Sequence, residues 1–67
     1  MKVGEIWEPI ENQHDELIRI HGLTTYKNSD AVTYQWYNME LDNVGSDVYI
    51  AGREAFIKIF RRHYESR

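Results

Sequence analysis

The sequence predicts a single small domain that is mainly β, with a short helix near its C-terminal end. Segments with alternating side chains, rich in β-branched and aromatic residues, are separated by short turns. The apolar fraction of 42% and the charged fraction of 28% are typical of a folded protein. A helical period replaces the alternation only towards the end of the chain. We therefore expect residues 1–67 to form a small barrel, or a curled antiparallel meander, of about four to five strands.

The first predicted strand lies within KVGEIWEPI, residues 2–10. Pro9, the single proline, has no backbone N–H to donate to a neighbouring strand. We therefore expect this strand to end near Glu8 or to run along a sheet edge. The polar segment ENQHDE, residues 11–16, predicts an acidic loop or a single helical turn.

The second predicted strand is LIRIHGLTTY, residues 17–26, whose side chains alternate between two faces. Ile18 and Ile20 share one face, and His21 lies on the other, where we expect it to be hydrogen-bonded. The next segment, KNSD at residues 27–30, predicts a turn. Asn, Ser and Asp favour turns because their side chains bond the local backbone and tolerate tight conformations.

The third predicted strand, AVTYQWYNMEL at residues 31–41, has the strongest β pattern in the chain. Its alternation places Tyr34 and Trp36 on one face and Tyr37 on the other. We expect Tyr37, like Tyr26, to lie outside the core. The aromatic residues expected inside the core are Trp7, Tyr34, Trp36, Phe56 and Phe60.

A turn and a short strand follow. DNVGSD, residues 42–47, predicts the turn, in which Gly45 can adopt a positive φ. VYIA, residues 48–51, predicts the strand, which ends at Gly52. Short strands at this spacing, joined by tight turns, are typical of a meander that curls into a small barrel.

The closing segment, residues 53–67, has a helical period. We expect Phe56, Ile59 and Phe60 to lie in the core, while the Arg pair at 61–62 would suit the negative end of the helix dipole. No Ser, Thr, Asp or Asn caps the start of this helix. A short helix followed by a final strand from about Phe60 is the alternative. The apolar stripe consists of Phe56, Ile57, Ile59, Phe60 and Tyr64.

Charge is distributed unevenly along the chain. Residues 1–52 hold three Lys and Arg residues and nine Asp and Glu residues, whereas residues 53–67 hold five and two. Such asymmetry marks either a segment that binds a polyanion or two surfaces that neutralise each other in the fold. The second interpretation is favoured because the net charge is only −3.

Four short segments carry a resemblance to a known family. GEIW at residues 4–7, VTY at 32–34, REAF at 53–56 and Phe60 resemble a pattern of small phage- and prophage-encoded proteins with an SH3-like barrel, mostly of unassigned function. The resemblance implies that Gly and Trp open the first strand, that VTY crosses the barrel and that REAF forms a short helix. It also implies a phage origin, the cytoplasm of a bacterial host, and no catalytic residues. The chain departs from the pattern in PIENQHDE and in YQWY.

The residue types do not indicate an enzyme. Cysteine is absent, which excludes disulfides, thiolate nucleophiles and Cys-based zinc sites. No serine lies in a G-x-S-x-G elbow, and no glycine-rich phosphate loop is present. His14, Asp15 and Glu16 form the densest acid–base cluster, and Glu11 with His14 and Asp15 could hold a divalent ion weakly, but a solvated acidic loop is the commoner explanation. We therefore predict no catalytic residue, metal site, cofactor or small-molecule substrate.

A membrane location is not expected either. No run approaches the roughly 20 apolar residues that span a bilayer. The start, MKVGEIWEPI, lacks the apolar run of a signal peptide. The expectation is a cytoplasmic protein.

Two non-enzymatic functions remain. In the first, the domain is an interaction or regulatory module that binds a protein partner, or a second copy of itself, through exposed Trp and Tyr side chains rimmed by carboxylates. An acidic surface that mimics nucleic acid is a variant of this function. In the second, the basic closing segment contacts nucleic-acid phosphates while aromatic rings stack on bases. The candidate binding residues are Trp36, Tyr37, Tyr26, Arg53, Lys58, Arg61 and Arg62.

Overall fold

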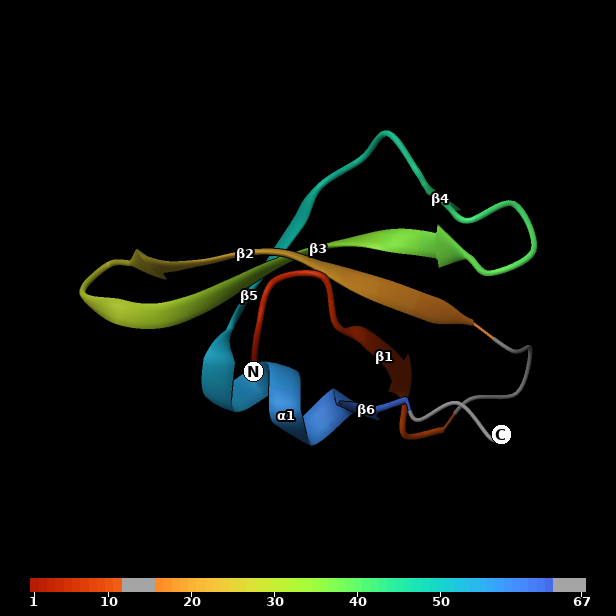
Figure 1. Cartoon of the computed structure of the whole chain (residues 1–67). Coiled ribbons are helices and arrows are strands. Elements are labelled where there is room, and N and C mark those ends of the chain that lie inside the picture. The colour runs from red at the N-terminus through yellow and green to blue at the C-terminus, as the bar shows by residue number, and fades with distance from the viewer. Residues whose placement is uncertain (12–15, 64–67) are drawn as a thin grey trace.

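The computed structural model describes residues 1–11 and 16–63 (Figure 1). The predicted class is confirmed: the chain is mainly antiparallel β-sheet with one short helix near its C-terminal end. Six strands form, rather than four to five, because two very short strands join the sheet. The elements are β1 (Ile6–Pro9), β2 (Leu17–Tyr26), β3 (Ser29–Asn38), β4 (Asn43–Val44), β5 (Tyr49–Gly52), α1 (Arg53–Ile59) and β6 (Phe60–Arg62).

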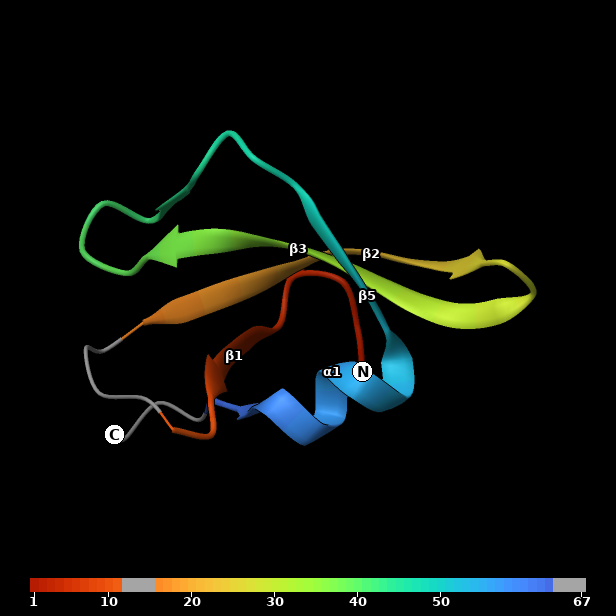
Figure 2. The same cartoon turned by 180° about the vertical axis from the view of Figure 1, so that it is seen from behind.

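The strands form one open sheet in the order β4-β3-β2-β1-β6. β5 also pairs with the N-terminal half of β3, whereas β4 pairs with the C-terminal end of β3. In the described residues, β6 does not pair with β4 or β5, so the sheet is a curled meander rather than a closed barrel. Figures 1 and 2 show the long β2–β3 hairpin crossing the molecule, with β1, β6 and α1 together on one side of it.

A tight turn at the tip of the hairpin joins β2 to β3. Tyr26 pairs with Ser29, and the two residues between them, Lys27 and Asn28, have φ of 51° and 65°. Positive φ at both central residues is the geometry that matches the twist of a two-residue hairpin. The turn is therefore shorter than the predicted 27–30 segment, because its last two residues already belong to β3.

The register of β2 against β3 shifts between Ile20 and Gly22. His21 lies at this irregularity, and its Nδ1 is 3.1 Å from Thr33 Oγ1, which confirms that the side chain is hydrogen-bonded. The Thr33 hydroxyl also donates to the Gly22 carbonyl at 3.2 Å. A Cβ added at Gly22 would lie 2.9 Å from Thr33 Oγ1, so the close approach of the two strands requires glycine here.

The first strand, β1, ends at Pro9 and lies between β2 and β6 in the sheet. The first of the two expectations for this strand therefore holds. Gly4 has φ of +91° and its N–H donates to the Ile20 carbonyl at 2.9 Å. Gly45 does not use its freedom to adopt a positive φ. Asp42 takes a positive φ in that turn instead, and the Gly45 N–H bonds to β3.

The core lies between the hairpin and the α1–β6 segment. Its buried residues include both phenylalanines, and Phe56 is in ring contact with Phe60, Trp7 and Tyr34 at centroid distances of 4.8, 5.2 and 5.5 Å. Trp7 and Tyr34, both expected in the core, are half-buried against this cluster. The buried residues of this core cluster are Ile18, Ile20, Val32, Phe56 and Phe60.

The closing segment follows the alternative prediction, a short helix and then a strand. α1 ends at Ile59, and Phe60 has extended φ and ψ of −118° and 153°. Ile59 is 54% exposed, so its predicted core position is wrong. The change to extended backbone turns Phe60 into the core and leaves Ile59 facing outward. The Arg pair at 61–62 belongs to β6 rather than to the helix end, and Tyr64 lies outside the described residues.

Candidate interaction surface

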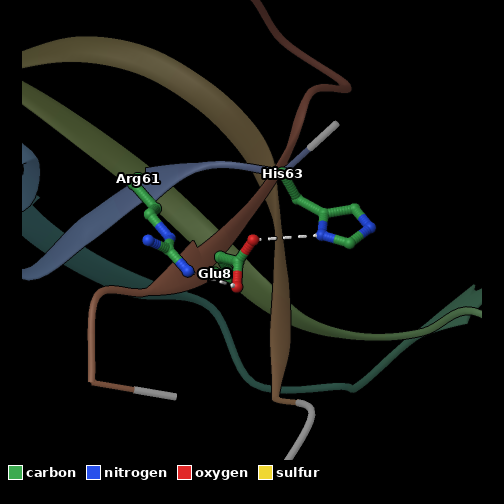
Figure 3. A network of polar contacts seen from close by, with 3 residues as sticks. All are labelled: Glu8, Arg61 and His63. Carbon is green, nitrogen blue, oxygen red and sulfur yellow. Dashed lines mark hydrogen bonds and ion pairs between the residues drawn. The ribbon is translucent and has the colours of Figure 1, made fainter. Parts of the chain in front are cut away.

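Two arginines of the basic closing segment face Glu8 of β1 and Glu5, which directly precedes β1, because β6 runs antiparallel beside that strand. Arg62 Nη1 lies 2.8 Å from Glu5 Oε2, and Arg61 Nη2 lies 3.6 Å from Glu8 Oε2. Glu8 also reaches His63, whose Nδ1 is 3.2 Å from Oε1; Figure 3 shows the carboxylate between the two basic side chains. This part of the charge asymmetry is therefore neutralised within the fold.

Glu5 contacts both an arginine and a tryptophan side chain. Burial by itself raises its pKa, but a backbone hydrogen bond from Lys2, the Trp7 indole and the positive charge of Arg62 together outweigh that effect. The Trp7 Nε1–H donates to Glu5 Oε1 at 3.1 Å. The pKa of Glu5 therefore lies below its ordinary value of 4.5. The ion pair with Arg62 joins the two ends of the described chain.

The other two predicted basic residues, Arg53 and Lys58, lie on α1 and are exposed. Neither forms an ion pair within residues 1–11 and 16–63. Arg53 borders two shallow hollows of about 400 and 440 Å³ between the start of α1 and the hairpin. The four predicted basic residues thus divide into a pair on α1 and a pair, Arg61 and Arg62, that contacts Glu8 and Glu5.

The three predicted aromatic residues do not share one surface. Tyr26 lies at the exposed tip of the hairpin, where Lys27 Nζ is 5.4 Å from its ring centroid. Tyr37 is half-buried, and its hydroxyl donates to Asp42 Oδ1 at 2.7 Å. Trp36 lies on the other face of β3, by the alternation along the strand. Trp36 was expected in the core, but 42% of it is exposed.

Trp36 is exposed because α1, the helix that covers this face of the sheet, is short. α1 has seven residues and packs against β3, β5 and β6. Tyr34 lies under this cover and is in ring contact with Phe56 and Phe60. Trp36 is one step further along the strand, and its ring contacts Tyr49 instead.

Tyr49 completes an aromatic row that runs from the core to solvent. Its ring stacks on Tyr34 at a centroid distance of 5.7 Å and meets Trp36 edge-on at 6.4 Å. Tyr49 is itself 39% exposed. Burial raises the pKa of Tyr34, and the neighbouring Tyr49 raises it further, so both features keep the Tyr34 phenol neutral. We call the exposed pair, Trp36 and Tyr49, the Trp36–Tyr49 surface.

Sequence reasoning did not single out Tyr49. The two tyrosines meet because β5 pairs with β3 in the register Tyr34↔Tyr49. An alternating pattern within VYIA marks Tyr49 as a strand residue, but it does not identify the strand beside it. The sequence offered only a weak indication that Tyr49 contributes to the surface. Tyr49 is an aromatic residue in a short predicted strand, and an aromatic-rich strand precedes that strand across a turn.

Along the sequence, the segment that holds Trp36 and Tyr49 is acidic and partly apolar. Residues 28–52 contain four carboxylates and no Lys, Arg or His, whereas the other residues contain eight Lys and Arg against seven Asp and Glu. This window, which holds β3, β4 and β5, therefore carries the negative charge of the chain. Its carboxylates are Asp30, Glu40, Asp42 and Asp47, and its exposed apolar side chains are Trp36, Met39, Leu41, Val44, Val48, Tyr49 and Ile50.

A separate cavity of about 630 Å³ lies where β1, β2 and the end of β3 meet. Glu8, Leu17, Tyr37 and His63 line it, so it holds the carboxylate–imidazole contact described above. Such a contact can move a proton, but nucleophilic catalysis also needs a Ser, Thr or Cys beside it. Among the described lining residues there is none. The cavity geometry therefore does not assemble a nucleophilic site.

The described ranges contain neither a cluster of metal-binding side chains nor a helix suited to a membrane. No group of three or more His, Cys, Asp or Glu side chains is placed to hold a metal ion in residues 1–11 and 16–63. The predicted acid–base cluster lies mostly outside these ranges, since residues 12–15 are not described. In the part of the chain that is described, no helix has the length and apolar character needed to cross a membrane.

Comparison of the chain with protein-family models, with curated proteins and with solved structures gives no match.

Proposed function

We propose that the chain is a non-enzymatic interaction module that binds a protein through the Trp36–Tyr49 surface. The observation that carries this proposal is an exposed tryptophan whose ring contacts a row of aromatic rings that reaches the core. Tyr34 contacts the core phenylalanines and stacks on Tyr49, which in turn contacts Trp36. A rigid aromatic side chain of this kind provides a large contact area at low entropic cost, as in the energetic centres of protein interfaces.

Other exposed apolar side chains lie in the segment that connects β3 to β5, namely Met39, Leu41, Val44 and Val48. Met39 lines the cavity beside Tyr37, and Val44 pairs with Tyr37, on the other face of β3 from Trp36. The proposal therefore rests on the aromatic pair itself.

Nucleic-acid binding through the closing segment is less well supported. Arg62 and Arg61 face Glu5 and Glu8, so phosphate would have to compete with carboxylates that are already in place. Trp36 and Tyr49 lie in a segment that lacks basic residues, and the exposed Tyr26 has Lys27 beside its ring at the hairpin tip. Base stacking requires rings beside a positive groove. The phage origin and bacterial cytoplasm implied by the resemblance stay predictions.

Selection of displayed random peptides on the folded full chain tests the proposal. Binding peptides should be recovered whose affinity falls by about tenfold or more in Trp36→Ala, the loss expected for an aromatic interface anchor. Tyr26→Ala is the matched control, because it also removes an exposed aromatic ring but at the hairpin tip. Circular dichroism and thermal unfolding of both variants establish that they are folded.

Sedimentation of the chain and fluorescence anisotropy with labelled single-stranded DNA, duplex DNA and RNA complete the test. Self-association that Trp36→Ala abolishes would identify a second copy as the protein bound. Recovery of no Trp36-dependent peptide and no Trp36-dependent self-association would refute the proposal. Binding of nucleic acid that weakens log-linearly with salt and is lost in Arg61→Ala/Arg62→Ala would replace it with the alternative function.

A further inference from the structure

We infer that the β2–β3 hairpin carries a second interaction site, at which a second copy of the chain pairs antiparallel with the outer edge of β2. The site consists of residues 22–26, which we call the β2 edge. Trp36 pairs further along the hairpin, with Ile18, so the β2 edge lies apart from the Trp36–Tyr49 surface. The inference therefore goes beyond the proposed function and does not depend on it.

The end of the hairpin projects from the rest of the molecule, as Figures 1 and 2 show. Residues 23–30 are all exposed. In the described ranges, the outer side of β2 is paired only as far as Ile20, by β1 and the segment just before it. Two strands by themselves are marginally stable in water, whereas three or more support one another. The projecting end therefore has a free edge that a further strand would stabilise.

The turn determines which backbone groups of this edge face outward. Tyr26 and Ser29 flank a two-residue turn, so they form a hydrogen-bonded pair. Hydrogen-bonded pairs alternate along antiparallel strands, so the N–H and C=O of Thr24 also face β3. The N–H and C=O groups of Leu23 and Thr25 face away from β3. Two outward residues separated by one position are what an antiparallel strand needs in order to pair.

A second copy of the chain presents the same arrangement, so a two-fold axis at Thr24 pairs the two edges along their whole length. Leu23 of each copy lies opposite Thr25 of the other, and these outward residues exchange hydrogen bonds. Thr24 lies opposite Thr24, which is a favourable cross-strand pair. Tyr26 lies opposite Gly22, where an aromatic ring can cover the backbone that glycine leaves open. Each copy thus supplies both members of every cross-strand pair.

The charge and the limits of the β2 edge fit the same occupant. Residues 22–26 contain no charged side chain, so the pairing brings no like charges directly opposite each other. Edge strands are commonly protected by a Lys, a Pro or a bulge. Here the register shift lies before Gly22 and the turn follows Tyr26, so the stretch between them has none of these. The outer strands β4 and β6 have only two and three residues.

Mixing two oppositely charged variants tests the inference. Sedimentation from about 10 μM to about 1 mM should show a dimer weaker than about 1 μM, because a short strand edge buries less than the standard interface of about 1,600 Å². Thr24→Lys and Thr24→Glu each place like charges opposite each other at the two-fold axis, so each should weaken the dimer by about fivefold. An equimolar mixture of the two variants should restore the affinity, because opposite charges then meet.

Ser29→Lys and Ser29→Glu are the matched controls. Ser29 is exposed in the same hairpin end but lies in β3, so both variants should dimerise as the wild type does. Hydrogen exchange provides a second measurement. The amides of Leu23 and Thr25 should become more protected as the protein concentration rises, whereas the Thr24 amide, already bonded to β3, should change much less. Circular dichroism establishes that the variants are folded.

The outcomes separate this inference from the proposed function. Absence of self-association at about 1 mM would overturn the inference. A dimer that is as stable in Thr24→Lys as in the wild type would overturn it too, and loss of that dimer in Trp36→Ala would assign it to the Trp36–Tyr49 surface. Restored association in the mixture of the two Thr24 variants would establish the pairing of β2 edges, whatever peptide selection finds for Trp36.

Discussion

Replacement of Phe56 tests the arrangement of the core most directly. Phe56 is completely buried and is in ring contact with Trp7, Tyr34 and Phe60. Phe→Ala changes in a core cost about 3–5 kcal/mol, from lost burial and from the cavity that remains. A chain of 67 residues has a total stability of roughly 3–10 kcal/mol. Phe56→Ala should therefore remove about a third or more of that stability, and all of it at the lower end of the range.

Ile57→Ala is the matched control, since Ile57 follows in the same helix and is 51% exposed. Its loss should be about 1 kcal/mol or less, because much of the side chain already contacts water. Phe56→Leu keeps part of the volume while removing the ring contacts, so a loss of about 1–2 kcal/mol should leave a measurable transition.

Urea denaturation followed by tryptophan fluorescence and circular dichroism measures all three variants. Trp7 reports on this site directly, because its ring contacts Phe56. Equal losses in Phe56→Ala and Ile57→Ala, or a larger loss in Ile57→Ala, would mean that α1 presents a different face to the sheet. That result would refute the core assignment.

Three further predictions concern the sheet. Because the pKa of Glu5 is lowered in the fold, its ionised form stabilises the protein above the ordinary pKa of 4.5, and that contribution is lost as the pH falls through the lower folded pKa. Glu5→Gln should therefore lower the free energy of unfolding by about 1 kcal/mol at neutral pH. In acid-unfolding curves, the difference in stability between this variant and the wild type should shrink below pH 4.5. A difference that stays constant with pH would contradict the lowered pKa of Glu5. Gly22→Ala should destabilise by about 1–3 kcal/mol through its clash with Thr33, and adding Thr33→Ala should restore part of that loss in a double-mutant cycle, whereas strict additivity would exclude the clash. Lys27→Asn/Asn28→Gly should raise the thermal midpoint through a gain of about 1 kcal/mol, since both turn residues have positive φ; a lower midpoint would show that the turn has another geometry.

Local pattern determined most of the secondary structure. β-branched and aromatic alternation located β2, β3 and β5, and Pro9 marked the end of β1. These features are readable because the side-chain period of a strand and the missing N–H of proline are properties of neighbouring residues. The end of α1 was left open between two alternatives, since Phe60 fits both a helical stripe and the first position of a strand.

The candidate surface was only partly readable. Trp36 was named as a binding residue and, at the same time, was expected to be buried, because alternation assigns a face but not the extent of its cover. Tyr49 was missed. The Arg pair at 61–62 was a candidate for phosphate contact, although the fold places both side chains against carboxylates, Glu8 in β1 and Glu5 just before it.

The sequence by itself determined a small, mainly β chain with one closing helix, no thiol chemistry and a basic end. Only the tertiary structure decided which charges meet and which aromatic rings reach solvent. Arg62 and Glu5 are 57 positions apart, and their ion pair depends on β6 returning beside β1. Trp36 is exposed because α1 ends before covering it, and Tyr49 joins it through the pairing of β5 with β3. Contacts of this kind follow from strand order and helix length, which no local pattern of residues encodes.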